Sequence, residues 1–123
     1  MKILLVLLGG SLGAVCRYGV GLAAARLYGE AFPWGTLCVN LVGCFLIGLA
    51  FALGVERNVL SPAFRLFFVT GFLGALTTFS TYALESVSFT RDGLVITSLW
   101  NLLANNVGGL LLVVAGMWAG RSL

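Results

Sequence analysis

Apolar residues run along the chain in four long stretches, and short polar turns that carry most of the charges separate them. Residues 31–55, for example, contain no charged side chain. About 20 apolar residues in a helix cross the hydrocarbon core of a bilayer, and Pro33 and Pro62 stand where the first turn of a helix tolerates proline. The pattern therefore predicts one all-α transmembrane domain over residues 1–123, with helices at about 2–27, 34–55, 63–89 and 94–119.

The composition is not that of a water-soluble protein. Of the 123 residues, 60% are hydrophobic and 9% are charged, and the mean hydropathy is +1.09, whereas soluble domains are about 25% charged. These values exclude a soluble enzyme domain and a disordered tail. The net charge of +3 comes without a run of lysine or arginine, which argues against a nucleic-acid surface. We expect the apolar run after Lys2 to be a retained membrane helix and not a cleaved signal peptide.

The reactive side chains are few. Histidine is absent, which excludes a histidine metal site, a histidine general base and a Ser-His-Asp triad. Lys2 is the only lysine and stands at the start of the first span, so no hydroxyl nucleophile has a lysine base beside it. We therefore expect no enzymatic activity. We interpret the cysteines, which are odd in number and form no CxxC motif, as small apolar side chains: Cys16, Cys38 and Cys44.

The middle of the third span is unusually polar for its depth. Two glycines precede four hydroxyl residues that fall within five positions: Gly71, Gly74, Thr77, Thr78, Ser80 and Thr81. This predicts a break near the middle of the third helix, because non-helical backbone at that depth survives only inside protein or beside water. The carbonyl and N–H groups that such breaks free often bind ions. The same residues would also suit a tight helix-packing surface, and composition alone leaves both interpretations open.

Small or polar residues form rows on the other spans. On the first span a row recurs every fourth position, a spacing that lets a partner backbone approach closely: Gly9, Gly13, Arg17, Gly21 and Ala25. The fourth span has a row at the same spacing: Thr97, Asn101, Asn105 and Gly109. On the second span Asn40 lies near Thr36 and Gly43. We interpret these faces as surfaces that contact protein or line a pore.

Two ionisable side chains fall within the predicted spans, Arg17 in the first and Glu85 in the third. Ionisable groups at membrane depth are costly and point to function by default. The alternatives are that Arg17 extends its charged end to the membrane surface and that Glu85 lies close to that surface.

The distribution of the remaining charges gives a weak orientation signal. One side of the membrane would carry four basic residues and the other side two, namely Lys2, Arg57, Arg65 and Arg121 against Arg26 and Arg91. Basic residues set membrane orientation, and so small a bias allows insertion in both directions.

The remaining polar groups in the spans are neutral amides and hydroxyls, which can donate hydrogen bonds to an anion without trapping it. Phe79 and Tyr82 stand three residues apart, on one helical face. Because the edge of an aromatic ring is positive, ring edges and amide donors together could replace part of an anion's water shell. The alternative is that the two rings simply pack against each other.

The sequence resembles the Fluc or CrcB family of small bacterial fluoride ion channels over essentially its whole length. Three motifs in the same order carry the resemblance: Gly9-Gly10-Ser11-Leu12-Gly13-Ala14 before Arg17-Tyr18, Gly35-Thr36-Leu37 before Val39-Asn40 and Gly43, and Gly71-Phe72-Leu73-Gly74 before Thr77-Thr78-Phe79-Ser80-Thr81.

The resemblance implies an antiparallel, dual-topology homodimer of four-helix subunits in the bacterial inner membrane. The family carries two fluoride pores in each dimer and exports fluoride passively from the cytoplasm, which lowers its toxicity. A structural sodium ion at the dimer centre is held by backbone carbonyls at the break in the third helix. Those positions match Gly74 and Thr77 here.

The resemblance also assigns the pore. The pore asparagine matches Asn40, the first pore phenylalanine matches Phe79, and the second falls on Tyr82, with Ser80 and Thr81 as further pore residues. The family's helix-one arginine matches Arg17, and its glutamate matches Glu85. We expect these two residues and Thr36 to lie at a vestibule or to have a structural polar role. This chain departs from the family pattern at Tyr82, at Ala75, and at two fourth-span positions that often carry hydroxyls, Gly109 and Val113.

Two other functions fit a chain of four spans. A small proton-coupled cation or multidrug antiporter, also of dual topology, needs a carboxylate deep in a helix, and Glu85 is the only candidate. A membrane scaffold or subunit that transports nothing would need only the small-residue rows.

Overall fold

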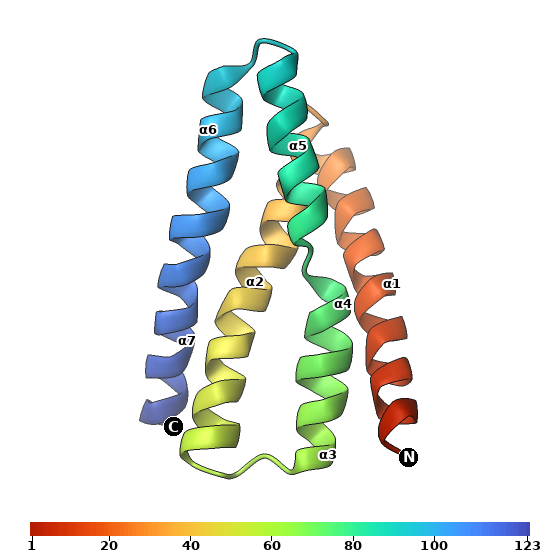
Figure 1. The fold of residues 1–123 in the computed structure, drawn as a ribbon, viewed down its shortest axis with the longest axis vertical. Coiled ribbons are helices and arrows are strands. Elements are labelled where there is room, and N and C mark those ends of the chain that lie inside the picture. Colours follow the sequence, from red (N-terminus) through yellow and green to blue (C-terminus); the bar gives the residue numbers. More distant parts are fainter.

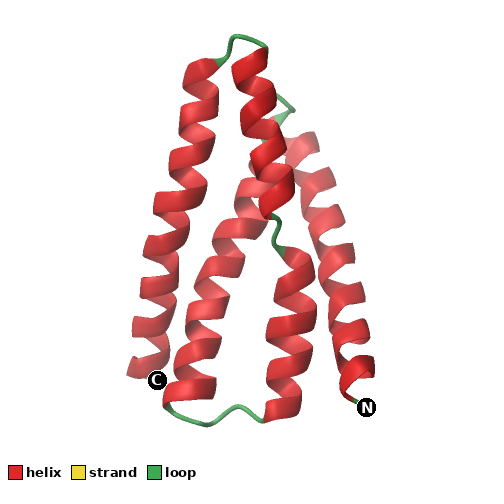
Figure 2. Cartoon of the chain, viewed as in Figure 1, coloured by secondary structure: helices red, strands yellow, loops and turns green.

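The computed structural model describes all 123 residues and contains helices joined by short loops, without any strand (Figures 1 and 2). The first span is α1 (Lys2–Tyr28), and the second is α2 (Trp34–Phe51) with the π-helical η1 (Ala52–Glu56). The third consists of α3 (Pro62–Arg65), the π-helical η2 (Leu66–Leu73), α4 (Gly74–Leu76) and α5 (Phe79–Arg91). The fourth consists of α6 (Val95–Leu103), the π-helical η3 (Ala104–Gly108) and α7 (Gly109–Ser122).

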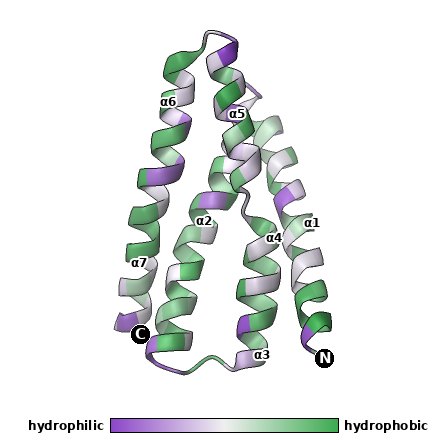
Figure 3. Cartoon of the chain, in the orientation of Figure 1, coloured by the Kyte–Doolittle hydropathy of each residue, from purple (hydrophilic) through white to green (hydrophobic).

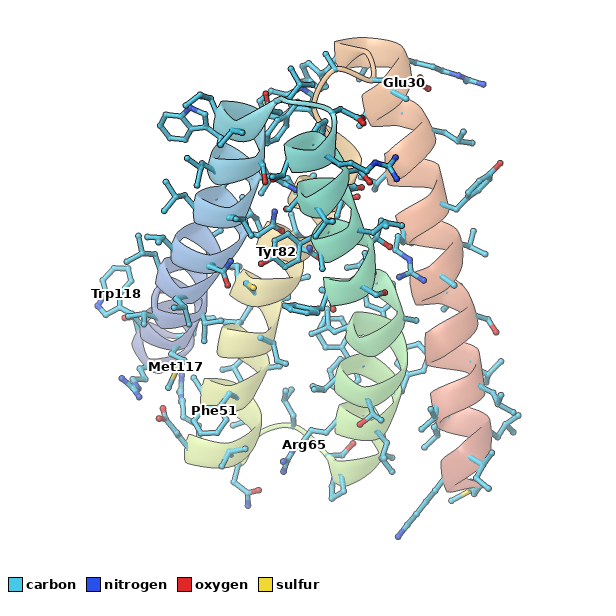
Figure 4. All side chains as sticks on the ribbon, turned by 45° about the horizontal axis from the view of Figure 1, so that its top comes forward. Glu30, Phe51, Arg65, Tyr82, Met117 and Trp118 are labelled. Carbon is cyan, nitrogen blue, oxygen red and sulfur yellow. The ribbon has the colours of Figure 1, made fainter.

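Each span, taken as one helical rod, is long and apolar enough to cross a membrane: Lys2–Tyr28, Trp34–Glu56, Pro62–Arg91 and Val95–Ser122. Hydrophobic residues cover most of their length, and hydrophilic ones gather at the ends and at a few positions halfway along (Figure 3). Large apolar side chains such as Trp118, which is 70% exposed, point outward from the rods (Figure 4). The prediction of an all-helical membrane protein with four spans is confirmed.

The rods pack as two close pairs, α1 along η2 and α4, and α2 along α7 (Figure 1). Glycines permit both contacts. A Cβ atom on Gly9 would overlap the Phe67 carbonyl oxygen, and one on Gly116 would overlap the carbonyl oxygen of Phe45. The predicted small-residue row on the first span is therefore a helix-packing face, as Gly13 against Phe72 also shows.

Local hydrogen bonds fix where the spans begin and end. Ser61 Oγ accepts a hydrogen bond from the Phe64 N–H at 3.2 Å, and with Pro62 in the first turn this starts the third span. At the end that holds both termini, Arg121 forms two hydrogen bonds with Glu56, at 2.6 and 2.7 Å. This pair ties the end of the second span to the end of the fourth.

Two glycines on the same helix offer a matched test of this packing. We predict that Gly9→Ala lowers the stability of the folded protein by about 1–3 kcal/mol, because the added methyl group has no space against η2. Nothing lies within 4 Å of a Cβ atom on Gly19, so Gly19→Ala should leave stability unchanged or raise it slightly. Thermal melting of the purified variants in detergent measures both. Equal midpoints for the two variants would contradict the packing role of Gly9.

Candidate functional site

The third span is interrupted in its middle by two extended residues, which we call the Thr77–Thr78 segment. α4 ends at Leu76, Thr77 has φ −84° and ψ 156°, Thr78 has φ −150° and ψ 116°, and α5 begins at Phe79. Figure 2 shows this segment as a short loop between two helices of the same rod. Because each helical N–H donates to a carbonyl four residues earlier, the interruption leaves backbone groups that need other partners.

The side chain of Asn40, on α2, supplies partners to Thr78. Asn40 Oδ1 accepts a hydrogen bond from the Thr78 N–H at 2.8 Å, and Asn40 Nδ2 donates to the Thr78 carbonyl oxygen at 3.0 Å. One primary amide thus pairs with both backbone groups of one residue, as a neighbouring strand would. This arrangement satisfies an extended residue where water is scarce.

The hydroxyl of Thr78 then starts α5. Thr78 Oγ1 accepts a hydrogen bond from the Thr81 N–H at 3.3 Å and lies 2.9 Å from Thr81 Oγ1, to which it donates. It also lies 3.5 Å from the Ser80 hydroxyl. This is the N-cap arrangement, in which a threonine satisfies an N–H group that has no helical carbonyl.

These side-chain bonds leave two carbonyl oxygens without their helical donors. The N–H of Thr78 would donate to Gly74 in a continuous helix, but here it donates to Asn40. The N–H of Thr81 would donate to Thr77, but here it donates to the Thr78 hydroxyl. No side chain donates to either carbonyl oxygen, and neither oxygen is an acceptor among the backbone hydrogen bonds of the turns, loops and caps. Both residues predicted to hold a cation through their carbonyls therefore have those oxygens free.

Amides on the fourth span extend the Asn40 network. Asn40 Nδ2 also donates to Asn105 Oδ1 at 2.9 Å, and Asn105 Nδ2 donates to the carbonyl and side-chain oxygens of Asn101 at 2.9 and 3.0 Å. Asn101, which is fully buried, donates to the Ser86 hydroxyl at 2.9 Å. A continuous set of hydrogen bonds thus runs from the Thr77–Thr78 segment through α2, η3 and α6 to Ser86 on α5.

A cavity of about 320 Å³ lies beside this network, and we call it the central cavity. Its walls come from α2, from both sides of the Thr77–Thr78 segment and from η3: Asn40, Gly43, Cys44, Ile47, Val69, Leu73, Gly74, Thr77, Thr78, Phe79, Tyr82, Asn105 and Asn106. None of these residues carries a charge. Asn40, Phe79 and Tyr82, which the sequence predicts in a pore, thus line the same cavity as Gly74 and Thr77, whose carbonyls are predicted to hold a cation.

The two aromatic rings of the cavity lie edge to face. The ring centres of Phe79 and Tyr82 are 5.2 Å apart, and their planes are inclined at 76°. Tyr82 is buried, whereas Phe79 is 75% exposed and lies on the outer face of the single chain. Tyr82 Oη accepts a hydrogen bond from Asn106 Nδ2 at 2.8 Å. The expected shared face of the two rings is confirmed.

The other predicted polar residues lie elsewhere. Thr36 Oγ1 donates to Glu85 Oε1 at 2.7 Å, and Glu85 Oε2 is buried without a hydrogen-bond partner. Both residues line a separate cavity of about 300 Å³ near Glu30, which shares no residue with the central cavity. Arg17 is half-buried and forms neither a hydrogen bond nor an ion pair.

Two predicted pore residues, Ser80 and Thr81, do not line the central cavity of the single chain; they are exposed on the first turn of α5. Their role in a pore stays a prediction. Conversely, the pairing of Asn106 with Tyr82 was not foreseen from the sequence. The sequence signal for it is the adjacent pair Asn105-Asn106 inside an otherwise apolar span.

Comparison with known proteins gives consistent matches over the whole chain. Residues 4–117 match the family model described as CrcB-like protein, Camphor Resistance (CrcB). A protein of Salinibacter ruber named fluoride-specific ion channel FluC is 50% identical over 116 residues, which are 94% of this chain and 86% of that protein. A protein of the same name from Agrobacterium fabrum is 47% identical over 123 residues, which are 100% of this chain and 98% of that protein. Both names describe ion channels and not enzymes.

The bonds of Asn40 generate a prediction for stability. Asn40→Asp keeps the acceptor for the Thr78 N–H but replaces both N–H donors by an oxygen, which then faces the Thr78 carbonyl and Asn105 Oδ1. We expect a loss of about 1–3 kcal/mol for each buried acceptor left without a donor. Thermal melting in detergent measures this loss. Asn58→Asp, the same substitution in the loop before α3, is the control, and an equal effect of both changes would contradict the role of Asn40.

Proposed function

This chain belongs to the CrcB-like family, and from that membership we propose that it is a fluoride-selective ion channel of a bacterial inner membrane. It lets fluoride leave the cytoplasm down its gradient and so lowers the toxicity of the ion. The names of the relatives support this function, since they match at 47–50% identity over 94% or more of the chain.

The observation that carries the proposal is the chemistry of the central cavity. Its walls combine neutral amides and hydroxyls with two aromatic rings, and no charged side chain takes part. A channel must bind its ion strongly enough to admit it and weakly enough to release it. Ring edges and hydrogen-bond donors stabilise an anion without the deep trap that a lysine or arginine would form.

The same observation argues against a proton-coupled antiporter. Such a transporter needs a carboxylate in its transport site, and the only candidate, Glu85, lies outside the central cavity and bonds to Thr36.

We propose further that the channel is an antiparallel homodimer with two pores. Polar groups at the middle of the spans are exposed on the single chain: Gly74, Ser80, Thr81 and Asn106. Hydrocarbon cannot satisfy such groups, whereas a second copy of the chain that covers them can. The Thr77–Thr78 segment is then a break in a membrane-spanning helix that is shielded by protein. The weak charge bias between the two sides of the membrane supports insertion in both orientations.

A structural sodium ion at the dimer centre fits the free carbonyl oxygens of Gly74 and Thr77. Backbone carbonyls at helix breaks are suitable ligands for sodium in membrane proteins. No cluster of three or more His, Cys, Asp or Glu side chains exists that could hold a metal instead. In the dimer, the same two carbonyls of the second subunit would complete the coordination shell.

The sodium proposal predicts a specific dependence of stability on the cation. Replacing sodium by choline at equal ionic strength should lower the melting midpoint of the purified protein, since a ligand at 100 times its Kd adds about 2.7 kcal/mol of stability. Thermal melting in detergent across a sodium titration measures the effect. A midpoint that does not change from choline to sodium would refute the site.

The channel proposal is tested by fluoride efflux from liposomes loaded with potassium fluoride, followed with a fluoride electrode. The wild-type protein should release fluoride, and liposomes loaded with potassium chloride should retain their chloride. Phe79→Ile removes a ring edge from the cavity and should reduce fluoride efflux about tenfold or more, which corresponds to a loss of roughly 1.4 kcal/mol of ion stabilisation.

Phe64→Ile is the matched control, because Phe64 is on α3, is partly exposed and lies outside the central cavity. This variant should conduct like the wild type. Absence of fluoride efflux from a well-folded wild-type dimer would reject the channel and favour a scaffold. Full efflux through Phe79→Ile would reject the assigned pore.

A further inference from the structure

The hydroxyl of Tyr82 is a buried polar group whose proton has no acceptor within the chain. The side chain is 6% exposed and lies near the middle of the bundle (Figure 4). Its oxygen has one partner, Asn106 Nδ2 at 2.8 Å, and the same Nδ2 lies 2.8 Å from the Leu102 carbonyl oxygen.

The Leu102 carbonyl fixes the direction of the Asn106–Tyr82 bond. A carbonyl oxygen can only accept a hydrogen bond, so the Asn106 atom beside it must be the nitrogen and not the oxygen. That nitrogen has two N–H groups, and one goes to Leu102 and the other to Tyr82. Tyr82 Oη is therefore the acceptor in this bond, and its own proton must point away from Asn106.

The other side-chain donors of the central cavity are all in use. Both N–H groups of Asn40 donate, to Thr78 and to Asn105. Both N–H groups of Asn105 donate to Asn101.

The threonine hydroxyls are used in the same way. Thr77 Oγ1 donates to the Leu73 carbonyl at 3.1 Å, and Thr78 Oγ1 donates to Thr81 Oγ1 at 2.9 Å. Apart from the weak thiol donor of Cys44, the Tyr82 hydroxyl is the one side-chain donor on the cavity wall that remains free.

We propose that the Tyr82 O–H is the side-chain hydrogen-bond donor that fluoride meets in the central cavity, and that Asn106 is the positioning residue that keeps this proton available. The proposal rests on the proposed channel function. An O–H group that donates to an anion makes a short, charge-assisted hydrogen bond, which is among the stronger kinds in proteins. The phenol thus supplies a free donor to a cavity whose amide and threonine donors already have protein acceptors.

The test compares initial rates of fluoride efflux over a range of fluoride concentrations. Tyr82→Phe keeps the ring and removes only the hydroxyl, and it should raise the half-saturating fluoride concentration about tenfold. Asn106→Leu should raise it less, because the phenol remains but its proton is no longer directed. In a chain that already carries Tyr82→Phe, Asn106→Leu should cause no further rise, since Asn106 acts through the hydroxyl.

Tyr18→Phe on α1 is the matched control; Tyr18 is 70% exposed, lies outside the central cavity and should not affect the half-saturating concentration. Wild-type protein without fluoride efflux would overturn the channel function and this proposal together. Fluoride efflux that is normal in the wild type and has the same half-saturating concentration in Tyr82→Phe would overturn this proposal alone. If Tyr82→Phe and Asn106→Leu lower the melting midpoint but leave the half-saturating concentration unchanged, the hydrogen bond between the two residues is purely structural. That result would also overturn this proposal.

Discussion

The paired hydrogen bonds between the Asn40 amide and the backbone of Thr78 are the interaction on which the rest of the site depends. They satisfy an extended residue in the middle of an apolar rod, where an unpaired N–H or carbonyl would be costly. Because the Thr78 N–H turns to Asn40, the Gly74 carbonyl is left free. Because the Thr78 hydroxyl then caps α5, the Thr77 carbonyl is left free as well. One side chain on α2 thus accounts for the interruption and for one of the two free carbonyl oxygens beside it, and the cap accounts for the other.

Few polar groups at the site remain free to bind an ion. The amides of Asn40, Asn105 and Asn106 each donate both N–H groups to protein acceptors, because polar groups among apolar spans need hydrogen-bond partners. What remains for an ion is a small set of groups whose partners have been taken. These are the carbonyls of the interruption for a cation and the Tyr82 hydroxyl with the ring edges for an anion. Neutral groups of this kind suit an ion that must also leave.

The sequence predicted the architecture well because hydrophobic length and glycine spacing act locally. The four apolar runs predicted the four spans, and the row through Gly9 and Gly13 predicted a packing face. The spacing of Phe79 and Tyr82 predicted that their rings share one helical face. The partnerships between distant side chains could not be predicted in this way. Asn40 and Thr78 are 38 residues apart, and Thr36 and Glu85 are 49 apart. Only the packing of α2 against the third span brings them together, and only the geometry shows in which direction each amide donates.

An experimental structure of the protein reconstituted with sodium and fluoride tests the central claim most directly. The account predicts that Thr78 remains extended and paired with Asn40, with a spherical density against the Gly74 and Thr77 carbonyl oxygens at the contact with a second copy. It also predicts an anion density within hydrogen-bonding distance of the Tyr82 hydroxyl. A continuous third helix, with the Thr78 N–H bonded to the Gly74 carbonyl and Asn40 turned elsewhere, would contradict the account.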